Sequence, residues 1–158
     1  MNKLSKKTIK NIAIIIMMAI FFILDRCLKY LALQTISGQP MGLIGSFLQF
    51  SFSKNYFIAF SLPLAGLALN ILIALIIISL LSYIFYLIIN KKAPKSLILP
   101  LTLILFGAIS NFTDRFIFGY VIDYFDCRYF TVFNIADIMI SLGVAYILLE
   151  SWKNKKYV

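Results

Sequence analysis

Aspartate carboxylates are the side chains of this sequence with the clearest capacity for chemistry. Asp114, Asp123 and Asp137 lie within one short stretch of a chain that has six acidic residues in all. Two carboxylates that share one proton can hydrolyse an amide, because one acts as base toward water and the other as acid toward the carbonyl and the leaving group. The chain has no histidine, which excludes Ser-His-Asp and Cys-His catalysis and histidine-ligated metals. We therefore expect chemistry by aspartates, with no metal and no cofactor.

Two of these aspartates follow an amide side chain at the same spacing. Asn111 precedes Asp114 by three residues, and Asn134 precedes Asp137 by three residues. In a helix this spacing places the amide one turn from the carboxylate. The amide can then donate a hydrogen bond to the ionised carboxylate and fix its orientation.

The composition indicates which elements must position these residues. Hydrophobic residues make up 62% of the 158 residues and charged residues only 13%, which is typical of a membrane protein and not of a soluble domain. A bilayer core of roughly 30 Å needs about 20 apolar residues per helical span. We predict a single all-α membrane domain, residues 1–158, with four transmembrane helices at about residues 12–33, 64–89, 96–114 and 134–152.

The lysines predict the orientation of these helices. Ten of the fifteen basic residues lie before the first span, between the second and third, or after the fourth: Lys3, Lys6, Lys7, Lys10, Lys91, Lys92, Lys95, Lys153, Lys155 and Lys156. The positive-inside rule makes these segments cytoplasmic, so both termini are inside and residues 34–63 and 116–133 are outer loops. The lysines form no patch interleaved with aromatic residues, which argues against nucleic-acid binding in spite of a net charge of +9.

With this orientation most of the acidic residues gather near the outer leaflet. A charge in a membrane helix costs on the order of 3 kcal/mol, so such residues usually pair, face a cavity or carry function. Asp25 and Lys29, four residues apart, could simply form an ion pair on one helix face. A polar stripe at helical spacing in the third span must face other helices, and it consists of Gly107, Asn111, Asp114 and Arg115.

The first outer loop has the pattern of a strand. Leu48, Phe50 and Phe52 alternate with polar residues, which predicts a short extracytoplasmic sheet with one apolar face. That face would contact lipid or an acylated ligand; an irregular aromatic loop is the alternative. Cys27 and Cys127 both fall on the outer side, where a disulfide is permitted, but two free thiols are the simpler interpretation.

Five motifs in this order resemble the lipoprotein signal peptidase family, signal peptidase II. Each motif alone is weak, but together they extend over nearly the whole chain, in register with four predicted spans. They are DRCLK (Asp25, Lys29), NYFIAF (Asn55, Ala59, Phe60), GAISNFTDR (Gly107, Asn111, Asp114, Arg115), GYVID (Val121, Asp123) and FNIAD (Asn134, Ala136, Asp137).

The resemblance implies an aspartic endopeptidase of the bacterial plasma membrane, with its active site toward the extracytoplasmic side. Such an enzyme removes the signal peptide from prolipoproteins and cuts just before the diacylglyceryl-modified cysteine, so its expected partners are this substrate and membrane lipids. By similarity the catalytic pair is Asp123 and Asp137. The residues that would support the pair or hold the substrate are Asn55, Asn111, Asp114, Arg115, Asn134, Asp25 and Lys29. We also expect a monomer.

The sequence departs from the family pattern at two points. Phe57 stands where the family motif has glycine, two residues after the asparagine. The spacing of 14 residues between Asp123 and Asp137 is also short for the family.

Two other classes of protein fit some of these observations. A small transporter or ion-conducting protein could use the same aspartates as a relay, but Glu150 is the only acidic residue toward the cytoplasmic side. A purely structural membrane subunit would explain the lysines and the apolar faces. It would not explain why so many acidic residues lie near one leaflet.

Overall fold

The computed structural model describes residues 6–34, 40–56, 66–90 and 93–153, with side chains from residue 12 onward. Several residues used in the predictions lie outside this part of the chain. They are Phe57 with its expected effect on the pocket, Ala59 and Phe60 of the same motif, and Lys3, Lys91, Lys92, Lys155 and Lys156.

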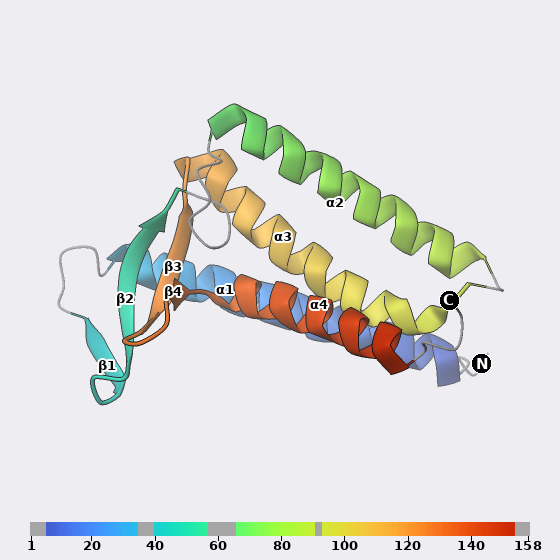
Figure 1. The fold of residues 1–158 in the computed structure, drawn as a ribbon, viewed down its shortest axis with the longest axis horizontal. Helices are drawn as coiled ribbons and strands as arrows, with labels where there is room; N and C mark the ends of the chain where they lie inside the picture. The colour runs from blue at the N-terminus through green and yellow to red at the C-terminus, as the bar shows by residue number, and fades with distance from the viewer. Residues whose placement is uncertain (1–5, 35–39, 57–65, 91–92, 154–158) are drawn as a thin grey trace, which may run out of the picture.

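Four long helices form at the predicted apolar segments (Figure 1). They are α1 (Lys6–Gln34), α2 (Gly66–Ile89), α3 (Ile98–Phe118) and α4 (Ile135–Lys153), and a short 3-10 helix, η2 (Lys95–Leu97), leads into α3. In the described part of the chain, α2, the segment Lys95–Phe118 and α4 are long and apolar enough to cross a membrane. The remaining predicted span, the first in the chain, corresponds to α1, which carries Asp25, Arg26 and Lys29 in its second half.

The third helix is one turn longer than predicted. Asp114 was expected to end it, but α3 continues to Phe118 and is terminated by Gly119. Gly119 adopts a φ of 80°, and its N–H donates to the carbonyl of Arg115 at 3.1 Å, which is the left-handed termination that glycine favours. Asp114 and Arg115 therefore lie within the helix and are both buried.

An antiparallel sheet lies at one end of the helices (Figure 1). It contains β1 (Met41–Ile44), β2 (Leu48–Asn55), β3 (Val121–Cys127) and β4 (Val132–Phe133), in that order. The strand predicted around Phe50 is confirmed. The mainly helical architecture and the small sheet after the first helix were predicted, but the sheet also includes β3 and β4, which come from the segment between α3 and α4 and were not predicted.

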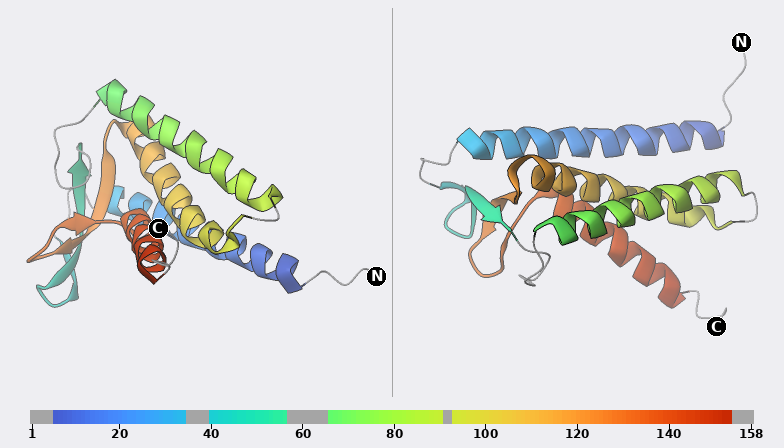
Figure 2. Two further views of the ribbon diagram at one scale, coloured as in Figure 1. Left: turned by 45° about the vertical axis from the view of Figure 1, so that its right-hand side comes forward. Right: turned by 90° about the horizontal axis from the view of Figure 1, so that it is seen from above.

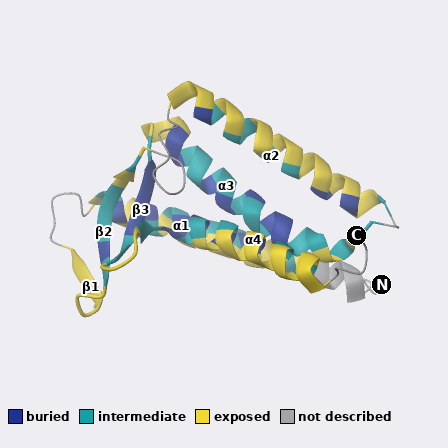
Figure 3. Cartoon of the chain, viewed as in Figure 1, coloured by how far each residue is buried: buried dark blue, intermediate teal, exposed yellow. Residues whose placement is uncertain are grey.

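The apolar face of the sheet packs inward. Phe50 is 7% exposed and clusters with Ala32 of α1 and with Ile122 and Tyr124 of β3. Its ring lies 5.6 Å from that of Tyr124, measured between centroids, and Phe52 packs against the same cluster. The expectation that this face contacts lipid or an acylated ligand is therefore wrong, since Phe50 and Phe52 pack against Ala32 of α1 and against β3 instead; Figure 3 shows that β3 is the most buried part of the sheet.

Helix α3 packs against each of the other three helices, whereas α2 exposes most of its apolar side chains (Figures 1 and 3). The contact between α3 and α4 is closest at Gly107, where a Cβ would lie 2.5 Å from the carbonyl oxygen of Ala136 and 2.8 Å from Ile140 Cγ1. Only glycine allows this approach. Cys27 is exposed and Cys127 is partly exposed, and both are free thiols, as expected.

Replacing Gly107 by alanine should move the start of α4 away from α3. We expect a loss of roughly 1–3 kcal/mol in the free energy of unfolding and a clear fall in activity, because Asp137 lies one residue beyond Ala136. Thermal unfolding of the purified protein in detergent measures the first effect. Val144→Ile, which adds one methyl group at an exposed position of α4, should be neutral. Equal stability of Gly107→Ala and the wild type would contradict this account.

Candidate active site

Asn134 joins the two aspartates of the predicted pair. It immediately precedes α4, and its carbonyl accepts a hydrogen bond from the N–H of Ile138 at 3.3 Å. Its side-chain Oδ1 accepts from the Asp137 N–H at 2.8 Å, while Asp137 Oδ2 accepts from the Asn134 N–H at 3.3 Å. This reciprocal arrangement is a capping box. The remaining group of Asn134, Nδ2, donates to Asp123 Oδ1 at 2.6 Å, so both carboxylates are bound to one residue.

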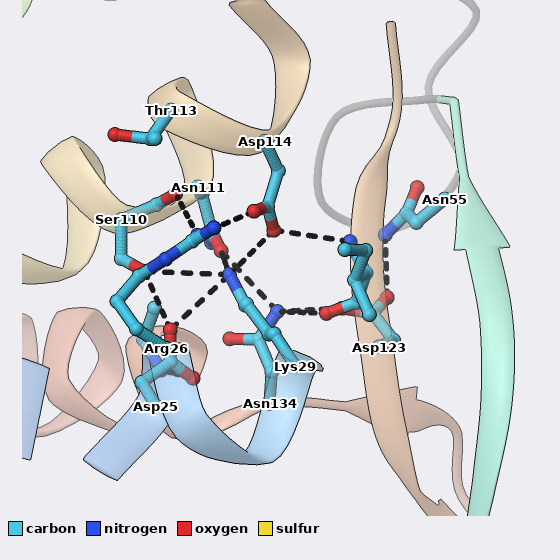
Figure 4. A network of polar contacts seen from close by, with 12 residues as sticks. Asp25, Arg26, Lys29, Asn55, Ser110, Asn111, Thr113, Asp114, Asp123 and Asn134 are labelled. Atoms are coloured by element: carbon cyan, nitrogen blue, oxygen red, sulfur yellow. Dashed lines mark hydrogen bonds and ion pairs between the residues drawn. The ribbon is translucent and has the colours of Figure 1, made fainter. Parts of the chain in front are cut away.

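Strand β3 carries Asp123, which was expected in a loop. Asn55, at the end of β2, donates from Nδ2 to Asp123 Oδ2 at 3.0 Å. With the bond from Asn134, each oxygen of Asp123 therefore accepts an amide N–H (Figure 4). Asp123 is 2% exposed, whereas Asp137 is only half-buried. A substrate can therefore reach the pair on the side of Asp137.

Burial and, to a smaller extent, the neighbouring Asp137 carboxylate raise the pKa of Asp123 to about 7. The amides of Asn55 and Asn134 act in the opposite direction, because they stabilise the ionised form. A carboxyl group that keeps its proton near neutral pH beside a second carboxylate is the arrangement that a proton-sharing pair requires.

Asn111 contacts the pair from α3. Its Nδ2 donates to Asp137 Oδ1 at 2.8 Å, and its Oδ1 accepts from Asn134 Nδ2 at 3.2 Å. The spacing in the sequence favoured bonds from each amide to the carboxylate on its own helix. The structure instead shows amide donation between elements, from α3 to Asp137 and from Asn134 to the strand residue Asp123.

A fully buried ammonium group lies behind the pair. Lys29 Nζ is 2.7 Å from Asp114 Oδ2, 3.2 Å from Asp25 Oδ2 and 2.8 Å from Asn111 Oδ1 (Figure 4). The predicted ion pair between Asp25 and Lys29 is confirmed. It is part of a larger cluster, because Lys29 is shared with Asp114 of another helix.

Asp114 and Asp25 each connect several elements. Asp114 forms an ion pair with Arg26 of α1, and its Oδ2 accepts from the Ile122 N–H of β3 at 3.2 Å. Asp25 accepts from three groups on three other elements: Ser110 Oγ at 2.5 Å, the Tyr124 hydroxyl at 2.8 Å and the Ala136 N–H at 3.3 Å. These two carboxylates therefore hold α1, α3, β3 and α4 together.

Arg115 is the remaining predicted site residue and is 8% exposed. Its Nη1 donates to the carbonyl of Tyr56 at 3.2 Å, which holds the chain just beyond β2 and so keeps Asn55 close to Asp123. The structure thus brings all nine predicted site residues into one region.

Arg26, Ser110 and Tyr124 also belong to this cluster, although the sequence did not predict them as site residues. Ser110 lies three residues after Gly107 and four before Asp114, so the polar stripe of the third span could have included it. Tyr124 gave no signal, because its role depends on the strand β3. Among the described residues, no three Cys, Asp or Glu side chains are arranged to hold a metal ion.

A separate hollow of about 390 Å³ lies at the tip of the sheet, lined by Ser46, Gln49, Asp126 and Arg128. None of these residues belongs to the polar cluster. The arrangement of reactive groups therefore identifies the region of Asp123 and Asp137 as the candidate active site.

Comparisons with known proteins agree on one family. Residues 17–153 match the family model described as signal peptidase (SPase) II. The lipoprotein signal peptidase of Clostridium tetani is 37% identical over 149 residues, which covers 90% of this chain and 94% of that protein. The lipoprotein signal peptidase of Halothermothrix orenii is 30% identical over 142 residues, covering 89% and 96%.

A solved structure described as a bacterial membrane enzyme, obtained by the in meso method at 2.3 Å resolution, has the same fold. Its TM-score against this chain is 0.75 with 28% sequence identity, and the match covers 92% of this chain and 93% of that chain.

Replacing Lys29 by methionine should destabilise the protein strongly. The change leaves the buried carboxylates Asp25 and Asp114 without their shared cation, and breaking a buried ion pair in this way costs roughly 3–5 kcal/mol. The measurement is unfolding in detergent, followed by circular dichroism. Lys54→Met, which removes an exposed lysine, should change stability little. Wild-type stability of Lys29→Met would show that the cluster does not depend on this charge.

Proposed function

The chain belongs to the signal peptidase II family and is a membrane protease that removes signal peptides from lipoproteins, and we propose that Asp123 and Asp137 form its catalytic pair. The observation that carries this proposal is the position of Asn134, which binds both carboxylates at once. Asn134 therefore holds the two carboxyl groups near each other through direct hydrogen bonds from its side chain and its backbone N–H.

Asp123 supplies the proton and Asp137 acts as the base. Near neutral pH the buried Asp123 holds its proton, whereas Asp137 lies in the first turn of α4, where the helix N-terminus favours a negative charge. Asp137 takes a proton from water as the water oxygen attacks the scissile carbonyl carbon, and Asp123 protonates the carbonyl oxygen. The resulting diol collapses as Asp137 gives its proton to the leaving nitrogen and Asp123 recovers a proton from a hydroxyl.

The charge balance of the polar cluster supports one shared proton. The cluster contains four buried or half-buried carboxylates, Asp25, Asp114, Asp123 and Asp137, against three cations, Arg26, Lys29 and Arg115. A single proton on the Asp123–Asp137 pair makes the cluster neutral. Neutrality lowers the cost of burying so many ionisable groups.

The proposed substrate is a prolipoprotein with a diacylglyceryl-modified cysteine, cut just before that cysteine. Asp137 lies at the start of a helix whose outer residues, such as Ile138 and Leu142, are exposed and apolar. Acyl chains that lie in the lipid beside this helix contribute to binding, since each buried methylene is worth about 0.8 kcal/mol. A single chain contains every residue of the proposed site, which supports a monomeric enzyme.

In the proposed topology α1 crosses the membrane in addition to α2, α3 and α4, which gives four spans. Both termini then lie in the cytoplasm of a bacterial cell. The sheet, whose strand β3 carries Asp123, lies at one end of the helices, whereas the first turn of α1 and the last turn of α4 lie at the other (Figure 2). Lysines flank that second end in the sequence, and the positive-inside rule makes it cytoplasmic. The active site then opens on the extracytoplasmic side of the plasma membrane.

Asparagine at either position of the pair should stop turnover. Asp123→Asn and Asp137→Asn keep size and hydrogen bonding but prevent proton exchange, so each should lose several orders of magnitude in kcat for a diacylated precursor. The double variant should be scarcely worse than either single variant, because residues that act as a unit are not additive. Cleavage is followed by gel mobility of the purified precursor in detergent.

The controls separate catalysis from folding. Asp114→Asn should lower the thermal stability, since Asp114 binds Arg26, Lys29 and the Ile122 N–H, while the folded fraction stays partly active. The same precursor without its diacylglyceryl group should not be cut. A well-folded but inactive Asp114→Asn together with a near-normal Asp123→Asn would overturn the proposed pair.

The pKa of Asp123 predicts a pH dependence of both rate and stability. Above about pH 7 the pair loses its shared proton, so kcat should fall about tenfold per pH unit. The folded state also holds this proton at pH values where the unfolded chain, with its ordinary pKa of 3.8, has lost it. The stabilisation is therefore complete below about pH 4 and is lost as the pH rises to 7.

Melting temperatures measured between pH 4 and pH 7 test this prediction. The melting temperature of Asp123→Asn should decline less over this range than that of the wild type, whereas Asp126→Asn should follow the wild type. Identical curves for the wild type and Asp123→Asn would contradict the assignment.

A further inference from the structure

Glu150 is an acidic residue that the proposed mechanism does not use. The other five acidic residues lie toward the end of the chain's helices that carries the sheet, whereas Glu150 lies in the last turn of α4, at the opposite end. It follows Gly143 by seven residues, so both lie on the same side of the helix. Because Gly143 faces Pro100 and Ile104, Glu150 lies on the side of α4 that packs against α3.

One carboxylate oxygen of Glu150 is buried without a partner. Within the described part of the chain, Glu150 Oε2 has no hydrogen bond and Glu150 forms no ion pair, not even with Lys153 in the same turn. Lys95, the described lysine at the start of η2, is already bound to the carbonyls of Leu87, Ile88 and Asn90. Glu150 as a whole is partly exposed, but a buried carboxylate oxygen without a partner is costly, so a cation that reached this oxygen would lower that cost.

The position of Glu150 along α4 matches the architecture of a signal peptide. A signal peptide has a positively charged N-terminal region, then an apolar region of about 7–15 residues, then the cleavage site. Glu150 lies thirteen residues after Asp137, which is about 20 Å along a helix. Suppose that the apolar region of the substrate is a helix of similar length that lies alongside α4, with its cleavage site at Asp137. The charged N-terminal region of the substrate is then at the level of Glu150.

The charge at this end of the molecule makes that position selective. In the sequence, lysines flank this end of the helices, so a cationic peptide segment is repelled there. Glu150 is the one acidic residue there. We propose that Glu150 binds the ammonium or guanidinium groups of the substrate's N-terminal region and so sets the register of the signal peptide. This inference rests on the proposed position of the catalytic pair.

Two diacylated precursors that differ only in this region test the proposal: one with its lysines and one with glutamines in their place. In lipid nanodiscs the wild-type enzyme should prefer the basic precursor by about fivefold in kcat/KM, the scale of a partly exposed ion pair. Glu150→Gln should reduce this ratio to about one by raising KM for the basic precursor, with kcat unchanged. Glu150→Lys should reverse the preference. Asp126→Asn, which removes one negative charge at the other end, should keep the wild-type ratio.

Each outcome decides the proposal. A wild-type enzyme with no preference, or a Glu150→Gln enzyme that keeps the preference, overturns it, and so does an equal loss on both precursors accompanied by a lower melting temperature. Glu150→Leu replaces the glutamine variant if that variant folds poorly. If the proposed catalytic pair is wrong, Asp123→Asn will still cleave both precursors. This result differs from a failure of the Glu150 proposal, in which Asp123→Asn is inactive but the precursor preference does not depend on Glu150.

Discussion

The fold depends on the neutralisation of one buried cation. Lys29 is fully buried where α1 packs against α3, and an unpaired ammonium group would be very unfavourable there. Asp25, one turn before it, and Asp114 of α3 supply the compensating charges. The same two carboxylates also accept N–H groups from β3 and α4. The requirement to pair Lys29 thus fixes the positions of the elements that carry the reactive groups.

The ion cluster also determines how the amides are oriented. Lys29 can only donate hydrogen bonds, so Asn111 must present its oxygen to Lys29 and its nitrogen to Asp137. Asn134 presents its oxygen to the Asp137 N–H, so its nitrogen is directed to Asp123. Each amide therefore has one orientation that satisfies all of its neighbours. Neutral N–H donors of Asn55, Asn111 and Asn134 therefore hold the carboxyl groups of Asp123 and Asp137 in place.

The sequence predicted the features that depend on local pattern. Apolar runs predicted the four helices, the spacing of Asp25 and Lys29 predicted their ion pair, and the alternation around Phe50 predicted β2. Gly119 carried a signal for the end of α3 that was not used, since glycine commonly terminates helices. Strand β3 could not be found in this way, because Val121 to Tyr124 are buried on both faces and show no alternation. The donation from Asn111 to Asp137 depends on the contact between α3 and α4, which no local spacing contains.

One polar cluster can stabilise the fold and also supply a reactive group, because its carboxylates have different neighbours. Asp25 and Asp114 form ion pairs with Lys29, and Asp114 also pairs with Arg26, which suits these two residues to a structural role. Asp123 is bound to the neutral amides of Asn55 and Asn134 and lies beside a second carboxylate, so burial raises its pKa instead. Four aspartate side chains thereby separate into two that are ion-paired and hold the elements together and two that are proposed to exchange a proton. The difference between the two kinds of aspartate comes from their neighbours alone, so it can arise in a chain that has no histidine.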